Sequence, residues 1–185
     1  YLIEHVNKIQ KISKSKIKIK LIGKDAESND NSNIECCNKT EFYILFTYSF
    51  DIYSPIICGN CFCPIPLYKI YKSTDNGVLR WQKDYIRFDD LQLNCDLHEK
   101  FALKEISKIT SNLSKRGLEI CKDLEKITNK PAFYYLFYYS KNNSKKYINR
   151  KCPSCNDEWL LEEPLNNFFR FKCDKCRIIS SLSVY

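Results

Sequence analysis

The 185-residue sequence lacks several features that would assign it to a common class of protein. It has no run of about 18 apolar residues, so a membrane span is not expected. Residues 1–5 lack the basic start and apolar stretch of a secretory signal. Methionine is absent, which indicates a chain that begins after its initiator. We therefore expect a cytoplasmic protein with no membrane association.

The sequence is also poor in residues that carry out catalysis. It has only two histidines and no glycine-rich loop of the kind that binds phosphate. A cysteine nucleophile with His98 as its base is the one enzymatic alternative, and the paired carboxylates Asp89 and Asp90 resemble a helix surface. We therefore predict a protein that is not an enzyme.

Cysteine, in contrast, is abundant, with eleven residues. Cys152 and Cys155 form one Cys-x-x-Cys pair, and Cys173 and Cys176 form a second pair after 17 intervening residues. This spacing is typical of a Zn²⁺ site with four thiolate ligands. Each pair is expected at the tip of a short hairpin, so that the four sulfurs close the site and exclude water. The alternative, two disulfides, requires an oxidising compartment.

A second metal site is also predicted, from Cys58 and Cys61 with Cys95 and His98. Other cysteines compete for the same role, and they are Cys36, Cys37 and Cys63. In the alternative interpretation the residues between Cys58 and Cys61 form a tight turn, and the thiols are simply buried.

The formal net charge is +8, which suits an acidic partner but also ordinary solubility. The basic residues concentrate just before the pair Cys152 and Cys155 and just before the pair Cys173 and Cys176. Those predicted to contact phosphate are Lys141, Lys145, Lys146, Arg150, Lys151, Arg170 and Lys172. The stretch 141–151 equally fits a soluble linker between domains.

Periodicity predicts an α+β fold. Apolar residues recur at helical spacing in residues 2–12 and 78–91, and over a long helix from about 102 to 127 whose weakest stretch is 110–114. Asp96 and Glu99 resemble the start of that helix, and Pro131 limits its end to about Asn129. Strands are expected at 16–23, 41–50, 66–71 and 131–139. The predicted domains are an α+β domain over 1–140 and a zinc ribbon over 141–185.

Six aromatic residues crowd positions 133–139. A stacking platform for bases would use such residues, but a central strand buried on both faces accounts better for their density. We therefore expect a core strand.

The sequence from about residue 54 to 182 resembles a family of bacterial proteins described as containing a zinc ribbon and as candidates for nucleic-acid binding. The motifs that carry the resemblance are Cys58-Gly59-Asn60-Cys61, Pro66-Leu67-Tyr68, Arg80-Trp81-Gln82, Leu91-Gln92-Leu93-Asn94-Cys95, Ser111-Asn112-Leu113-Ser114 with Gly117, Pro131 with Tyr134-Tyr135-Leu136, both later cysteine pairs and Arg177. The usual glycine after the first of those pairs is Asn156 here. Asparagine is the next best residue for a left-handed backbone.

Two functions follow as hypotheses. The first is a non-catalytic zinc-ribbon protein that binds nucleic acid, with DNA and RNA equally open. The alternative is a protein-binding module, such as an immunity or inhibitor protein that captures a specific partner, for example a toxin. The sequence predicts neither the oligomeric state nor a role for residues 1–50.

Overall fold

The computed structural model describes residues 2–13, 36–37, 39–50, 53–71, 77–95, 97–140, 148–181 and 183–184. The chain divides into two compact units, Tyr1–Glu35 and Cys36–Tyr185. The first unit contains helix α1 (Leu2–Ser13), which confirms the helical spacing predicted there. The strand predicted at 16–23 lies outside the described residues.

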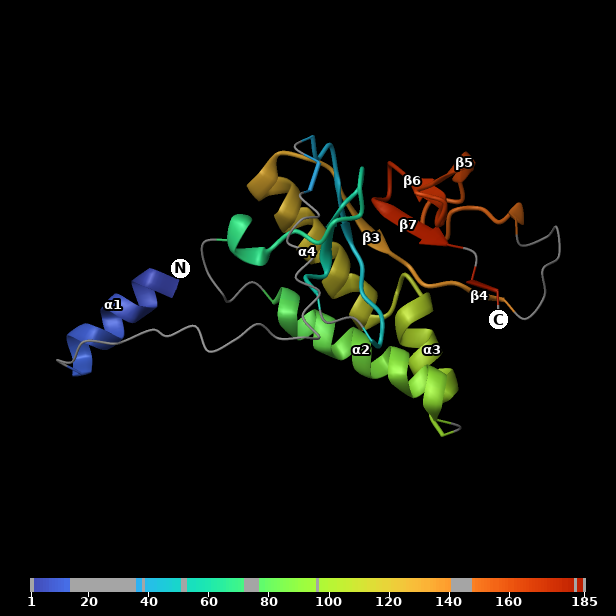
Figure 1. Ribbon diagram of the computed structural model, residues 1–185. Coiled ribbons are helices and arrows are strands. Elements are labelled where there is room, and N and C mark those ends of the chain that lie inside the picture. The colour runs from blue at the N-terminus through green and yellow to red at the C-terminus, as the bar shows by residue number, and fades with distance from the viewer. Residues whose placement is uncertain are drawn as a thin grey trace. The chain divides into compact units, whose positions relative to one another are not determined.

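The second unit is built on a mixed six-stranded sheet (Figure 1). The strand order is β2-β1-β3-β7-β6-β5, and the strands are β1 (Tyr43–Leu45), β2 (Ile56–Cys58), β3 (Ala132–Tyr135), β5 (Leu160–Leu165), β6 (Phe169–Cys173) and β7 (Ile178–Ser181). Strand β3 pairs in parallel with both β1 and β7. A separate parallel pair joins β4 (Tyr139–Ser140) to β8 (Ser183–Val184). The α+β class is therefore confirmed.

Three helices pack beside this sheet: α2 (Val78–Asn94), α3 (Glu99–Ser107) and α4 (Asn112–Thr128). Helix α4 contacts β3 and β1, and α2 and α3 each pack against α4. The predicted long helix is thus two helices, and the break at residues 108–111 overlaps the start of its predicted weakest stretch. Its end is as predicted, because Asn129 closes α4 in a left-handed conformation.

Ser111 explains the break between α3 and α4. Its side chain accepts a hydrogen bond from the Ser114 amide, which caps α4, and its hydroxyl donates to the Glu105 carbonyl. The Glu105 carboxylate in turn accepts from the Leu113 amide. Asp96 lies outside the described residues, and α3 begins after His98, whose side chain makes no capping hydrogen bond.

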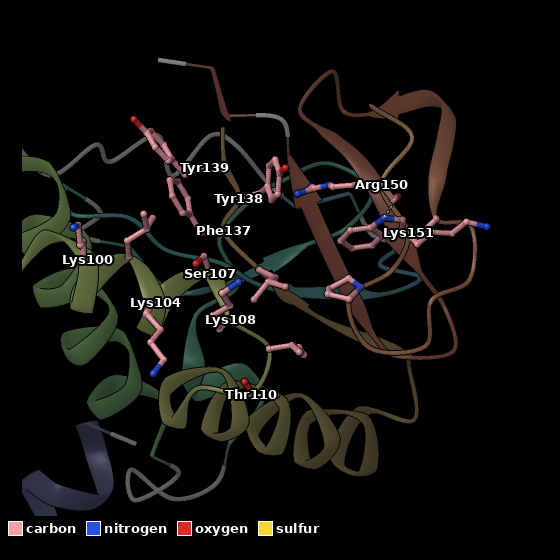
Figure 2. A pocket seen from close by; sticks show the side chains of 15 residues that line it. Lys100, Lys104, Ser107, Lys108, Thr110, Phe137, Tyr138, Tyr139, Arg150 and Lys151 are labelled. Atoms are coloured by element: carbon pink, nitrogen blue, oxygen red, sulfur yellow. Dashed lines mark hydrogen bonds between the residues drawn. The ribbon is translucent and has the colours of Figure 1, made fainter. Parts of the chain in front are cut away.

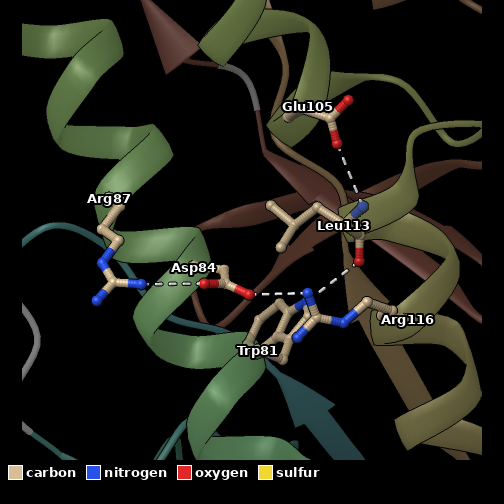
Figure 3. A network of polar contacts seen from close by, with 6 residues as sticks. All are labelled: Trp81, Asp84, Arg87, Glu105, Leu113 and Arg116. Carbon is tan, nitrogen blue, oxygen red and sulfur yellow. Dashed lines mark hydrogen bonds and ion pairs between the residues drawn. The ribbon is translucent and has the colours of Figure 1, made fainter.

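A second polar network joins α2 to α4 (Figure 3). The Trp81 indole donates to the Leu113 carbonyl at 3.2 Å, and Asp84 binds Arg116 at 2.8 Å. Trp81 is fully buried, so its N–H needs this partner.

Strand β3 is buried on both faces, as predicted. Tyr134 points under α4, where its hydroxyl meets Ser114 at 3.2 Å. Tyr135, which alternates to the other face, packs on Phe46 and Phe169 and pairs with the Ser181 hydroxyl at 2.9 Å. The aromatic residues of β3 therefore form core and are not a platform for bases.

Three strand predictions were inaccurate. Of the strand predicted at 131–139, β3 covers only Ala132–Tyr135, and Tyr139 belongs to β4. Residues 66–71 contain a short 3₁₀ helix, η1 (Leu67–Lys69), and not a strand. Pro66 precedes it without an N–H to donate to a sheet. Of the strand predicted at 41–50, only Tyr43–Leu45 pairs.

The boundary at residue 140 stays a prediction. The strands that follow it continue the same sheet, because β7 pairs with β3. None of the helices in the described part of the chain combines the length and the apolar composition needed to cross a bilayer.

Candidate metal centres and a basic cleft

The four cysteines near the carboxyl end come together as predicted. Cys152 and Cys155 lie in a turn before β5, Cys173 ends β6, and Cys176 lies in the turn to β7. Their sulfurs all lie within 4.8 Å of one another, and the Cys155 and Cys173 sulfurs are 3.6 Å apart. A tetrahedron with Zn–S bonds of about 2.3 Å has edges of about 3.8 Å. The four thiols therefore fit a single tetrahedral ion.

The backbone around Cys152 is shaped as metal knuckles are. The Asn156 amide donates to the Cys152 carbonyl at 2.9 Å, and the Cys152 amide donates to the Asp157 carbonyl at 2.9 Å. Asn156 takes a left-handed φ of 61°, as predicted, and Arg177 takes the same place after the second pair with φ 55°. Each cysteine pair is thus followed directly by a residue with a left-handed backbone conformation.

The thiols of this group are electrostatically unequal. Burial tends to raise the pKa of Cys176, but hydrogen bonds from Ser154 and the neighbouring cysteines outweigh it and leave that pKa lowered. Burial raises the pKa of Cys173. The Cys176 thiol is therefore more acidic than an ordinary cysteine, and a bound cation would drive ionisation of the others.

The second predicted metal set is wrong in two of its four members. Cys58 and Cys61 gather with Cys36 and Cys37, and not with Cys95 and His98. Cys95 is exposed at the end of α2, and His98 is exposed at the start of α3.

Helix α2 explains this difference. A 17-residue helix is about 26 Å long, so it carries Cys95 well away from its own first turn. The α2–α3 connection lies at the bottom of the view in Figure 1, and the segment near residue 40 lies at the top. The adjacent cysteines at 36 and 37 were the available signal, and the sequence alone did not favour them over Cys63.

Most of the described basic residues predicted to contact phosphate have partners within the protein. The Arg150 guanidinium stacks on Tyr138 and Phe171. Lys151 binds Glu158 at 2.6 Å, and Lys172 binds Asp174 at 2.7 Å while its ammonium lies over the Phe133 ring. Arg170 is exposed. Lys141, Lys145 and Lys146 lie outside the described residues.

A cleft that the sequence did not reveal lies between α3 and the segment 150–159 (Figure 2). It has a volume of about 710 Å³ and is lined by five basic residues: Lys100, Lys104, Lys108, Arg150 and Lys151. None of its described lining residues has a carboxylate side chain. Aromatic side chains also line it, among them Tyr138 and Tyr139.

The lysines on the α3 side are the available cations of this cleft. Lys100, Lys104 and Lys108 are exposed and form no ion pair with any other residue that the structure describes. Their spacing of four residues places them along one side of α3 and its end. Figure 2 shows them across the cleft from Arg150 and Lys151.

Comparison with known protein families gives two matches, and both lie in the second unit. A profile described as a domain of unknown function, DUF2310, matches residues 37–137, and another so described, DUF8594, matches residues 141–185. The chain belongs to the DUF2310 family. Neither description names a zinc ribbon.

Two relatives occur in the bacterium Haemophilus influenzae, each described as an uncharacterized protein. One is 36% identical over 166 residues, which cover 88% of this chain and 62% of the relative. The other is 35% identical over 166 residues, which cover 88% of this chain and 80% of the relative. This chain thus spans less than two thirds of the first relative. No solved structure matches the chain.

Proposed function

We propose that this protein is a non-catalytic, zinc-stabilised protein that binds nucleic acid in the basic cleft. Cys152, Cys155, Cys173 and Cys176 would hold Zn²⁺ as a zinc ribbon. Four thiolates complete the tetrahedron and leave no position for a reactive water, which favours a structural ion over a catalytic one. All eleven cysteines are free, which suits the reducing cytoplasm.

The observation that carries the nucleic-acid proposal is the row of three lysines on this cleft, which form no ion pair and meet no carboxylate among the residues that the structure describes. Such a surface attracts a chain of phosphates, since each neutralised phosphate releases counterions. The zinc ribbon would contribute by fixing the opposite wall, because Arg150 and Lys151 directly precede Cys152. We therefore assign the main phosphate contacts to α3, in place of the stretch 141–151 predicted from the sequence.

The residues suited to catalysis have other roles or positions in the structure, which supports a binding function. His98 is exposed and lies outside the cysteine group that contains Cys58 and Cys61. The Asp89 carboxylate accepts hydrogen bonds from the Ser49 amide and hydroxyl. Among the described residues that line the cleft, none has a carboxylate that could act as a base.

The test is a salt titration of binding to labelled single-stranded DNA, single-stranded RNA and duplex DNA by fluorescence anisotropy. The variant replaces Lys100, Lys104 and Lys108 with alanine. Its matched control replaces three exposed lysines on α2 and α4, namely Lys83, Lys115 and Lys122, and so makes the same change in net charge.

We expect the cleft variant to reduce the slope of log K against log salt by about 2–3, and the control to reduce it by less than 1. Equal effects of both variants would contradict the placement in the cleft. Absence of binding to all three probes at low salt would contradict the function. A stoichiometric protein partner recovered from the native host after nuclease treatment would then favour the alternative of a protein-binding module.

A further inference from the structure

The turn at Cys58 repeats the hydrogen bonding of the turn at Cys152. The Cys58 amide donates to the Cys63 carbonyl at 3.0 Å, and the Phe62 amide donates to the Cys58 carbonyl at 2.9 Å. These bonds join the same relative positions as the two bonds around Cys152. Phe62 also corresponds to Asn156, and it takes a left-handed φ of 62°. Three Cys-x-x-Cys turns in this chain therefore share one conformation after the second cysteine.

Phenylalanine is an unusual residue for that conformation. A left-handed backbone costs a residue with a side chain about 1–2 kcal/mol, and only asparagine and aspartate offset part of the cost locally. Strain of this kind persists where the surroundings require it, and it concentrates at ligand sites. The centres of the Phe62 and Phe169 rings lie 5.1 Å apart in an edge-to-face contact, which helps to hold the turn.

The sulfurs at this turn have the spacing of metal ligands. Cys37 and Cys58 have their sulfurs 3.6 Å apart, and Cys36 and Cys61 have theirs 3.8 Å apart. All four sulfurs lie within 4.8 Å of one another, the same limit that holds for the group near the carboxyl end. Both groups therefore match the edge of a tetrathiolate Zn²⁺ site.

Polar groups around these sulfurs are placed to support thiolates. The Cys37 amide donates to the Cys61 sulfur at 3.4 Å, and the Thr40 hydroxyl donates to the Cys58 sulfur at 3.4 Å. Such donors orient metal ligands and stabilise their negative charge.

The rest of the turn is anchored so that the sulfurs stay together. The Asn60 side chain accepts from the Glu41 amide at 2.8 Å, and the Gly59 carbonyl accepts from the Asn166 side chain at 3.1 Å. The Phe42 ring covers Gly59 so closely that any Cβ there would overlap it. A side chain at position 59 would therefore force the Phe42 ring to move.

We propose that Cys36, Cys37, Cys58 and Cys61 bind a second Zn²⁺ ion, independent of the ion near the carboxyl end. Four sulfurs in a tetrahedral arrangement select zinc or iron, and the two sites share their geometry. The second ion links the segment at residues 36–37 to the β1–β2 hairpin. Those strands have only three residues each, so the ion adds a cross-link where the sheet has few hydrogen bonds.

The experiment measures metal content of the full chain, purified under reducing conditions, by elemental mass spectrometry. We expect two zinc ions per chain in the wild type. Replacing Cys36 and Cys37 together with serine leaves one, and replacing Cys152 and Cys155 together also leaves one. The control that replaces Cys95 with serine keeps both ions, because this exposed sulfur belongs to neither group.

A cobalt titration of the metal-free wild type counts the sites without any variant, so its result does not depend on whether the variants fold. Tetrathiolate Co²⁺ has an intense visible absorption, and two equivalents are expected to generate it. A single zinc and a single cobalt equivalent would overturn the proposal, as would loss of one ion in the control. Iron in place of zinc, with the absorption of an iron–sulfur site, would also overturn it. Because the Cys152 and Cys155 variant removes the other ion, failure at either site is recognised separately.

Discussion

The guanidinium carbon of Arg150 lies 3.5 Å from the centre of the Tyr138 ring. The same group lies 4.1 Å from the centre of the Phe171 ring and donates to the Ser180 hydroxyl at 2.8 Å. Burial lowers the pKa of Arg150 to about 10, so the side chain remains charged at neutral pH. Arg150 therefore fastens the segment before Cys152 to β6 and β7, and it does not extend toward a phosphate.

The Arg150→Ala variant is expected to lose about 2–4 kcal/mol of unfolding free energy, since it removes stacking on two rings and the hydrogen bond that the buried Ser180 hydroxyl accepts. Arg150→Lys recovers only part of this, because an ammonium cannot stack as a planar group. Chemical denaturation measures the unfolding free energy of both variants. The exposed Arg170→Ala variant is the control and should change the free energy by less than about 0.5 kcal/mol. An Arg150→Ala loss as small as that control's would contradict this role.

Gly117 on α4 provides a second test of packing. An ideal Cβ at this position would overlap the Tyr134 ring and approach the Trp81 indole nitrogen to 3.1 Å. Gly117→Ala therefore separates α4 from β3 and is expected to cost about 1–3 kcal/mol, although alanine favours helices. Thermal and urea unfolding measure the change. Lys115→Ala, at an exposed position on α4, is the control, and a stabilised Gly117→Ala protein would refute the close contact.

Asp89 predicts a pH dependence of stability. Burial raises the pKa of its carboxyl above the usual value, against the lowering effect of two hydrogen bonds from Ser49. For an acid with a raised folded pKa, the favourable contribution is present below the unfolded pKa of about 4 and is lost as pH rises through the folded value.

Asp89→Asn removes this ionisation and keeps an acceptor for Ser49. Its stability relative to the wild type should rise with pH from about 4 and become constant above the folded pKa. Urea unfolding at a series of pH values measures the difference. The exposed Asp90→Asn variant is the control, and a pH-independent difference for Asp89→Asn would contradict the raised pKa.

The sequence predicted what depends on neighbouring positions. Trp81, Tyr85 and Phe88 recur on one helical face, and α2 forms there. The stripe of α3 and α4 was visible for the same reason. Its break depends on Ser111, whose capping bond competes with helix continuation over only a few residues.

Contacts between distant segments could not be predicted in the same way. The pairing of β3 with β7 joins residues more than 40 positions apart and depends on how the whole sheet assembles. The cysteine pairs at 152–155 and 173–176 were recognisable because each has its own fixed spacing. Cys36 and Cys37 have no such spacing to Cys58, and only the β1–β2 hairpin brings them together. The cleft lysines were missed because their common face appears only when α3 packs beside residues 150–159.

Removal of the ion near the carboxyl end should loosen one part of the sheet before the rest. Phe169 and Phe171 of β6 and Ile178 and Ile179 of β7 share the apolar core with β3 and α4, but Cys173 ends β6 and Cys176 lies in the turn to β7. Cys173→Ser therefore loses one zinc and is expected to increase hydrogen exchange of backbone amides in β5, β6 and β7, while amides of α4 stay protected, because the ion joins the turn before β5 to the turn between β6 and β7. Hydrogen exchange read by mass spectrometry measures both regions. A strong chelator added to the wild type should produce the same pattern of exchange. Cys95→Ser is the control. Unchanged exchange in β6 and β7 after verified loss of the metal would show that the ion is not structural.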